Sequence, residues 1–407
     1  MYVNIFKKSE FLLTLFIIFS IFPIIKIFNI SLSFFIFFII LFVFLKNKIK
    51  LFKIEYFPDY LLLIFLFIII LSWVFQEDTF IEVSFYKQVK LLFQFIYWII
   101  ITLFLKTWID KYDYIKISKV FFYGCLFSSI YYIFFNKLHP VFAPNAFAYT
   151  LVLSFPIASY YIIQEFSFFK KLIVNTFFIF AMIYSQSRTG LVLLMLEFFI
   201  IYFLDISKIK RFFLLYLLSF IMIFYVLFNI QSNLDTYKKE IANLIRPIAP
   251  KYAYTLTLKE DIFQRDKSFL IRKLMWQKCF DIFMQHPFLG IGPGNFTKFY
   301  VDLHPWEISN WLSSKSVYQY NKVSSQNSFI MVLSENGIVA LMILLILYLY
   351  ILINGISFFF RKDSFVSYIY LSIFILIIYS FILVTIMGTL YWLTLGMLLG
   401  LLKKDLK

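Results

Sequence analysis

Three polar motifs, far apart in this chain, hold residue types suited to binding phosphate or sugar groups. The first motif, residues 187–190, reads Ser-Arg-Thr-Gly, and the third motif, residues 326–328, reads Gln-Asn-Ser. The second motif, residues 286–296, begins with His-Pro and contains three glycines at alternate positions. The planar guanidinium of arginine binds phosphate oxygens in a bidentate manner. We therefore expect one anion-binding site if the fold brings the three motifs to the same side.

The composition indicates a membrane protein. The chain is 62% hydrophobic and only 15% charged, which differs strongly from a soluble protein of 407 residues. A transmembrane helix needs about 20 mostly apolar residues, and the segments 61–75, 212–228 and 329–352 meet or approach that length. The first apolar segment is not followed by a small-residue cleavage site, so we interpret it as a span and not as a signal peptide. The expected fold is an all-α polytopic membrane protein.

Twelve apolar spans can be assigned along the chain. They are residues 11–28, 30–45, 59–75, 91–105, 120–135, 146–163, 172–185, 190–204, 212–229, 329–353, 365–384 and 388–402.

The distribution of lysine and arginine orients these spans, because cytoplasmic loops carry an excess of both. With a cytoplasmic N-terminus, the inside loops and the tail contain Lys46, Lys48, Lys50, Lys53, Lys106, Lys111, Lys116, Lys119, Lys170, Lys171, Lys208, Lys210, Arg211, Arg361, Lys362, Lys403, Lys404 and Lys407. Short outside loops hold fewer, such as Lys26, Lys137 and Arg188. Both termini are therefore predicted to be cytoplasmic, and all three motifs to lie at the outer face.

Residues 230–328 are too long and too polar to be a simple connector. We predict three regions: spans one to nine in 1–229, a largely helical extracytoplasmic loop domain in 230–328, and the last three spans in 329–407. The loop carries 13 Lys and Arg against 8 Asp and Glu. This excess suits anionic headgroups or a pyrophosphate; the alternative is a solvated basic surface.

Within this loop, residues 266–285 are predicted to form a helix. Its aromatic residues Phe269, Trp276, Phe280 and Phe283 recur at helical spacing as one stripe. Arg272 flanks that stripe. Pro287 follows the expected helix end, and the glycines of the second motif predict a flexible turn.

Cysteine and histidine give no metal pattern. Cys125 and Cys279 have no spacing that indicates a disulfide framework. The three histidines, His139, His286 and His304, each precede a proline and lack zinc-ligand spacing. Turn and helix-end roles are the default for them, and no metal or cofactor is expected.

Arg188 is the strongest single candidate. An arginine near membrane depth is costly and usually marks a ligand or a pathway. The alternative is snorkelling toward headgroups, but snorkelling does not require the polar neighbours Ser187 and Thr189. Asn145 lies at the outer start of another span, where it can cap the helix.

The third motif also has a structural alternative, since Asn327 can cap the following helix. Glu335 lies eight residues beyond Asn327, roughly 12 Å along a helix at 1.5 Å per residue. At that depth its carboxyl must be paired or protonated. The adjoining Asn336-Gly337 loosens the helix.

The order of these motifs resembles the bacterial O-antigen ligase and O-antigen polymerase superfamily. The features that match are Ser-Arg-Thr-Gly opening a late span, a long outer loop with Arg272, Trp276 and then the second motif, and Asn-Ser-Phe followed by Glu335-Asn336-Gly337. The resemblance implies a glycosyltransferase of the bacterial inner membrane that takes an undecaprenyl-pyrophosphate-linked glycan at the outer face. It implies neither a nucleotide sugar nor a metal.

The resemblance also implies roles for single residues. The catalytic residues expected are Arg188, Arg272, Gln326 and Asn327. The substrate-binding residues expected are Asn145, Ser187, Thr189, Trp276, Gly292 and Ser328. The acceptor is a lipid-linked repeat unit in a polymerase and the lipid A core in a ligase. A chain-length regulator is a further partner, and no nucleic acid is expected.

One departure separates the candidate functions. In the ligases a histidine commonly precedes the asparagine of the third motif, and here that position is Gln326. Glutamine takes no proton near neutral pH, so the sequence favours a polymerase over a ligase. A flippase or transporter is the alternative of another class. Such a protein is expected to have repeat halves and charged residues near the bilayer centre. We find no repeat, and Glu197 and Glu335 are the exceptions in spans with few ionisable residues.

Overall fold

A computed structural model describes the greater part of the chain. The residues described are 2–21, 26–27, 30–47, 51–75, 85–136, 144–185, 187–204, 267–296, 327–359, 364–381, 385–386 and 388–405. Everything below concerns these residues.

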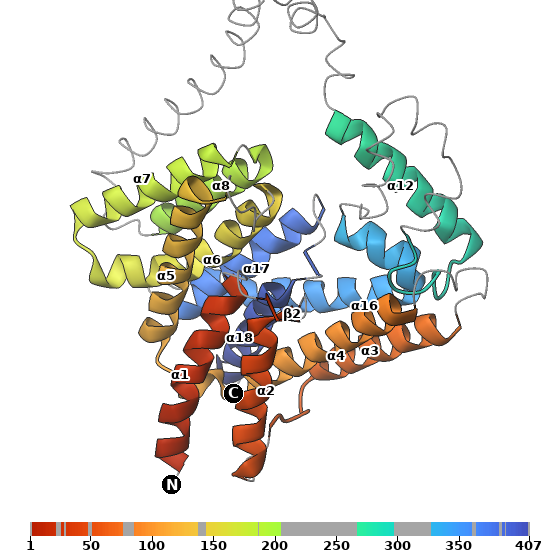
Figure 1. The fold of residues 1–407 in the computed structure, drawn as a ribbon, viewed down its shortest axis with the longest axis horizontal. Coiled ribbons are helices and arrows are strands. Elements are labelled where there is room, and N and C mark those ends of the chain that lie inside the picture. The colour runs from red at the N-terminus through yellow and green to blue at the C-terminus, as the bar shows by residue number, and fades with distance from the viewer. Residues whose placement is uncertain are drawn as a thin grey trace, which may run out of the picture. The chain divides into compact units, whose positions relative to one another are not determined.

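The described elements are almost entirely helical (Figure 1). They are α1 (Tyr2–Ile21), α2 (Leu32–Lys46), α3 (Phe57–Val74), α4 (Phe85–Trp108), η2 (Ile109–Lys111), α5 (Tyr114–Phe134), α6 (Pro144–Glu165), α7 (Phe168–Tyr184), α8 (Arg188–Leu204), α12 (Lys267–Gln285), α16 (Ser328–Phe359), α17 (Phe365–Ser380) and α18 (Thr389–Asp405). Two short strands, β1 (Lys26–Ile27) and β2 (Ile30–Ser31), pair antiparallel.

The helices agree with the predicted polytopic membrane protein. Five of them are long and apolar enough to cross a membrane: Phe57–Val74, Gln88–Lys111, Tyr114–Phe134, Asn145–Glu165 and Ser328–Ser357. Shorter apolar helices account for most of the remaining predicted spans, whereas the predicted span 212–229 lies outside the described residues.

The first predicted span, 11–28, extends too far. Residues 26–27 form β1 instead of helix, because the chain must turn before α2 and Pro23 cannot continue a helical hydrogen-bond ladder.

Packing of the helices produces one hydrophobic core. Helix α5 packs on α6, α4 on α18, and α17 on α6, while α3, α4 and α16 run beside one another (Figure 1). Trp392, Tyr379 and Tyr391 are the largest fully buried side chains. Large apolar residues on the outside, such as Phe42 and Phe67, are exposed. That arrangement suits a bundle whose outer surface meets lipid.

The chain divides into two compact units. One comprises Met1–Ile201 with Met275–Lys407, and the other Tyr202–Leu274. The predicted loop domain, residues 230–328, lies mostly outside the described residues, and its bounds stay a prediction.

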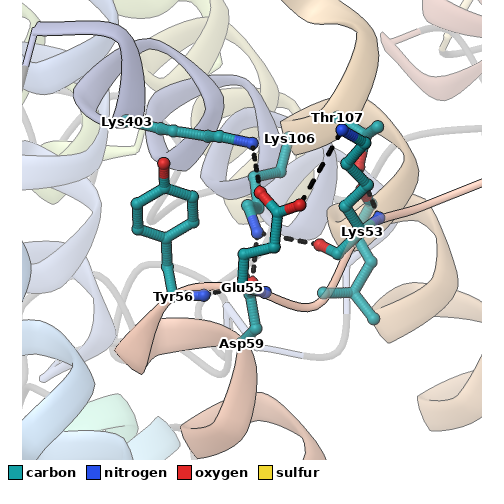
Figure 2. Close-up of polar contacts among 8 residues, drawn as sticks. Lys53, Glu55, Tyr56, Asp59, Lys106, Thr107 and Lys403 are labelled. Atoms are coloured by element: carbon teal, nitrogen blue, oxygen red, sulfur yellow. Dashed lines mark hydrogen bonds and ion pairs between the residues drawn. The ribbon is translucent and has the colours of Figure 1, made fainter. Parts of the chain in front are cut away.

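Charged residues gather where α3 begins and where α4 and α18 end (Figure 2). Lys106 forms an ion pair with Asp59, and their side chains are 2% and 0% exposed. The same carboxylate accepts hydrogen bonds from the backbone N–H groups of Glu55 at 2.9 Å and Tyr56 at 3.0 Å. Lys403 of α18 pairs with Glu55 at 3.3 Å. We call these residues the ionic cluster. It joins segments that were all predicted to be cytoplasmic, and α18 runs from it to the opposite end of the bundle.

Candidate functional site

The first motif meets the start of α6. Ser187 precedes α8, is buried, and its hydroxyl accepts a hydrogen bond from the Gly190 N–H at 3.4 Å. Serine is a preferred residue at this capping position, which explains why α8 begins at Arg188. The Ser187 hydroxyl also donates to Oδ1 of Asn145 at 3.2 Å. A Cβ atom on Gly190 would lie 2.5 Å from that of Ala148 in α6. The glycine therefore permits close contact between α6 and α8.

The third motif caps α16. Oδ1 of Asn327 accepts hydrogen bonds from the N–H groups of Phe329 at 2.9 Å and Ile330 at 3.1 Å. The capping role considered from the sequence is thus confirmed. The same side chain has a second contact, because its Nδ2 donates to the carbonyl of Phe381 at 2.9 Å. Asn327 therefore fixes the start of α16 to the end of α17.

Ser328 extends this connection to the turn between α17 and α18. Its hydroxyl accepts from the Thr385 N–H at 2.8 Å and lies 3.2 Å from the Thr385 hydroxyl. Thr385 Oγ1 also lies 2.5 Å from the hydroxyl of Ser380. Tyr149 of α6 donates to the Thr385 carbonyl at 3.4 Å. Thr385 consequently joins the beginnings of α6 and α16.

We call Asn145, Ser187, Asn327, Ser328 and Thr385 the polar cluster. It includes the first and third motifs and lies where α6, α8 and α16 begin. The ionic cluster lies at the far end of α18, a helix of 17 residues, where Lys403 is close to the last residue. The two motifs therefore lie at one end of the bundle and the ionic cluster at the other.

The second motif docks against an interruption in α16. Gly337 has φ 76° and ψ −178°, which breaks the helix. The N–H groups of Ile291 and Gly292 donate to the carbonyls of Ser334 at 3.1 Å and Glu335 at 2.9 Å. Beyond the break, the Ile338 N–H donates to the Pro287 carbonyl at 2.9 Å. The motif was expected to be a flexible turn, but three backbone hydrogen bonds hold it to α16.

Side chains from two other helices hold the same arrangement. Ser72 of α3 donates to the Glu335 carbonyl at 2.8 Å. Gln88 of α4 donates to Oδ1 of Asn295 at 3.0 Å, and Nδ2 of Asn295 donates to the Ile291 carbonyl at 2.7 Å. A Cβ on Gly337 would lie 2.0 Å from the Phe288 carbonyl oxygen. Only glycine allows this backbone conformation and this approach.

Helix α12 confirms the predicted helix at 266–285, but the packed face differs from the predicted aromatic stripe. Met275, Cys279 and Ile282 are buried, whereas Phe280 is 53% exposed. Burial raises the pKa of the Cys279 thiol far above its usual range, with the Ser334 hydrogen bond opposing the shift and the charge of Glu335 adding to it. Both described cysteines are buried and free.

The remaining predicted site residues are placed as follows. Arg188 is the first residue of α8 and Arg272 lies within α12, but their side chains are outside the described part of the chain. Gln326 lies outside the described residues. Thr189 and Trp276 are half-buried, and Gly292 is buried beside α16. The catalytic and binding roles assigned to all these residues stay predictions.

Sequence reasoning missed Thr385, Ser380, Ser72 and Gln88. A signal was present for the first, because Thr385 lies in the short gap between the last two apolar spans. Among the described residues, no group of three or more His, Cys, Asp or Glu residues is arranged to hold a metal ion.

Comparison of the sequence with models of known protein families gave a match. Residues 173–345 match the model of the family described as O-antigen ligase. This match confirms the resemblance to the O-antigen ligase and polymerase superfamily. The matched range contains all three motifs and the break in α16, while Asn145 and Thr385 lie outside it. A comparison with curated proteins gave no match. The family indicates a membrane glycosyltransferase-type enzyme that acts on lipid-linked glycans.

Proposed function

We propose that this protein is a polymerase that joins undecaprenyl-pyrophosphate-linked oligosaccharide repeat units at the outer face of the bacterial inner membrane. The observation that carries the proposal is the polar cluster, where the beginnings of α6, α8 and α16 meet through hydrogen bonds. The beginning of a helix carries partial positive charge, which favours phosphate. Arg188 adds a full charge at the first residue of α8.

The proposed reaction is a displacement at the anomeric carbon of the donor glycan. An acceptor hydroxyl oxygen forms the new glycosidic bond while the bond to the pyrophosphate oxygen breaks. The departing pyrophosphate gains negative charge, and Arg188 and Arg272 neutralise it, which is electrostatic stabilisation of the transition state. The proton of the acceptor hydroxyl passes to the departing pyrophosphate, so no histidine is required at position 326.

The second candidate function is an O-antigen ligase, which transfers the lipid-linked polysaccharide to the lipid A core. The description of the matching family favours it. Gln326 favours the polymerase, because the ligases commonly carry histidine there. The same donor site serves both reactions, and only the acceptor differs.

The proposal includes an orientation. Both termini are cytoplasmic, and the loop of residues 230–328 closes over the glycan from outside. The gathering of Lys53, Lys106 and Lys403 at one end of the bundle supports this orientation, since basic residues concentrate on the cytoplasmic side. A chain-length regulator is the proposed protein partner.

A deletion strain tests the function through its glycan ladder on a lipopolysaccharide gel. Lipid A core capped with single repeats identifies a polymerase. Uncapped core together with accumulated lipid-linked polymer identifies a ligase. A ladder that matches the parent strain excludes both functions. Complementation with the unaltered gene must restore the ladder, which controls for effects on neighbouring genes.

A further inference from the structure

Asn336 carries an unsatisfied amide at the break in α16. The residue is 0% exposed, and in the described part of the chain neither its Oδ1 nor its Nδ2 has a hydrogen-bond partner. Burial of an unpaired amide destabilises a protein. Nearly all buried polar groups in native structures are paired, and each exception requires an explanation.

The backbone polar groups on both sides of the break have hydrogen-bond partners. The carbonyls on its N-terminal side, those of Ser334 and Glu335, accept hydrogen bonds from the second motif, and the Ile338 N–H on the other side donates to it. The Ser72 hydroxyl adds a fourth hydrogen bond, which it donates to the Glu335 carbonyl. Asn336 is therefore not needed to cap the interrupted helix.

A second unpaired group lies in the helix that leads into the second motif. The indole Nε1 of Trp276 is buried and also has no partner among the described residues. One turn further along α12, Cys279 is within hydrogen-bonding reach of Ser334. The Asn336 amide in α16 and the Trp276 indole N–H in α12 are thus both buried polar groups without a partner among the described residues.

The chemistry of the amide indicates the ligand class. A carboxamide offers a donor and an acceptor side by side, and two adjacent hydroxyls of a sugar ring complement both. Glu335, which is 5% exposed, adds a carboxyl next to it. A side chain that is costly without a ligand but suited to one is typical of a binding residue.

We propose that Asn336 binds a pair of adjacent hydroxyls in the glycan of the lipid-linked substrate. The inference rests on the function proposed above. Ser328 and Asn336 are eight residues apart, about 12 Å along the helix. One substrate can therefore place its pyrophosphate at the polar cluster and its glycan at the break. Because Asn336 is fully covered, the docked second motif must shift to admit the sugar.

The test compares Asn336→Leu with a matched control, Asn354→Leu. Leucine has nearly the shape of asparagine and lacks the amide. Asn354 lies on the same helix, and its Nδ2 donates to the Tyr350 carbonyl of its own helix at 2.8 Å. Each purified protein is heated with lipid-linked oligosaccharide extracted from the deletion strain, or with undecaprenyl pyrophosphate that bears no glycan.

We expect Asn336→Leu alone to unfold at an equal or higher temperature than the wild type. It should lose the stabilisation by lipid-linked oligosaccharide and keep the stabilisation by undecaprenyl pyrophosphate. Its glycan transfer should be slower by roughly tenfold or more, as the loss of two hydrogen bonds to the sugar predicts. Asn354→Leu should respond to both probes. If Asn336→Leu folds poorly, Asn336→Ala, which removes the amide without adding apolar bulk, must show the same loss.

An Asn336 variant that responds to lipid-linked oligosaccharide as the wild type does, with unchanged transfer, overturns the inference and leaves the proposed function standing. A wild-type protein that responds to neither probe and transfers no glycan overturns the proposed function, and the inference falls with it. The two failures are thereby distinguished.

Discussion

Replacement of Gly337 by alanine should release the second motif from α16. The added Cβ would lie 2.0 Å from the Phe288 carbonyl oxygen, far inside van der Waals contact. The conformation at φ 76° and ψ −178° is essentially restricted to glycine, and it costs other residues about 1–3 kcal/mol. With alanine at position 337, α16 cannot keep the geometry of the break while the second motif stays docked.

The magnitude follows from the contacts that hold the loop. Three backbone hydrogen bonds join residues 287–292 to α16, and each contributes about 1 kcal/mol. Loss of docking therefore removes about 3 kcal/mol, which corresponds to hydrogen exchange on the order of 10²-fold faster at the amides involved. Those amides belong to Ile291, Gly292 and Ile338.

Hydrogen exchange measured by mass spectrometry in detergent tests this reasoning. Gly124→Ala is the control, because the three atoms nearest to the Cβ it adds belong to the Ile21 side chain and not to the second motif or α16. We expect faster exchange at the three amides in Gly337→Ala and no change in the control. A Gly337→Ala protein whose three amides exchange as slowly as in the wild type would show that docking does not depend on the glycine.

Three further predictions concern the site and its orientation. Arg188→Ala and Arg272→Ala should each slow glycan transfer by about 10²–10³-fold, the usual cost of removing a group that stabilises developing charge. Arg188→Lys should restore the rate only in part, because lysine lacks the planar guanidinium. A normal glycan ladder at normal expression would contradict this prediction. Thr385→Val should slow transfer by roughly tenfold or more because it removes the hydroxyl contacts with Ser328 and Ser380, whereas Thr394→Val, which breaks only a bond to Leu390 at 2.9 Å within α18, should not; equal effects would assign Thr385 a general stabilising role. In a cysteine-free background, the thiol of a Ser313→Cys variant should react with a membrane-impermeant thiol reagent in cells whose inner membrane is intact. Labelling only after that membrane is permeabilised would show that the proposed orientation is reversed.

Much of the helical architecture was predictable because span length and apolar composition are local properties. The predicted range 146–163 lies within α6, for example, and 91–105 lies within α4. Capping was predictable for the same reason, since Asn327 binds N–H groups two and three residues ahead of it.

The contacts that build the site were not predictable, because they join residues far apart in the chain. Ser72 and the Glu335 carbonyl are separated by 263 residues, and no local pattern links them. The buried face of α12 was not predictable from the sequence for a related reason. Its aromatic residues have helical spacing, but the buried face carries Met275, Cys279 and Ile282, whose contacts come from residues far away in the chain. A glycine-rich segment also has the same composition whether it is flexible or held by backbone hydrogen bonds.

The chemical difference between the two ends of α18 has a consequence for ligand binding. In the ionic cluster, Lys106 and Lys403 have permanent counter-ions in Asp59 and Glu55. The polar cluster consists of asparagine, serine and threonine, which carry no formal charge and cannot act as counter-ions. The oxygens of Ser187 and Asn327 accept hydrogen bonds from N–H groups at these helix beginnings, but no member of the cluster adds a negative charge there. An anion that binds at this end therefore has no carboxylate of the cluster to displace. The anion itself supplies the negative charge that the cluster does not contain.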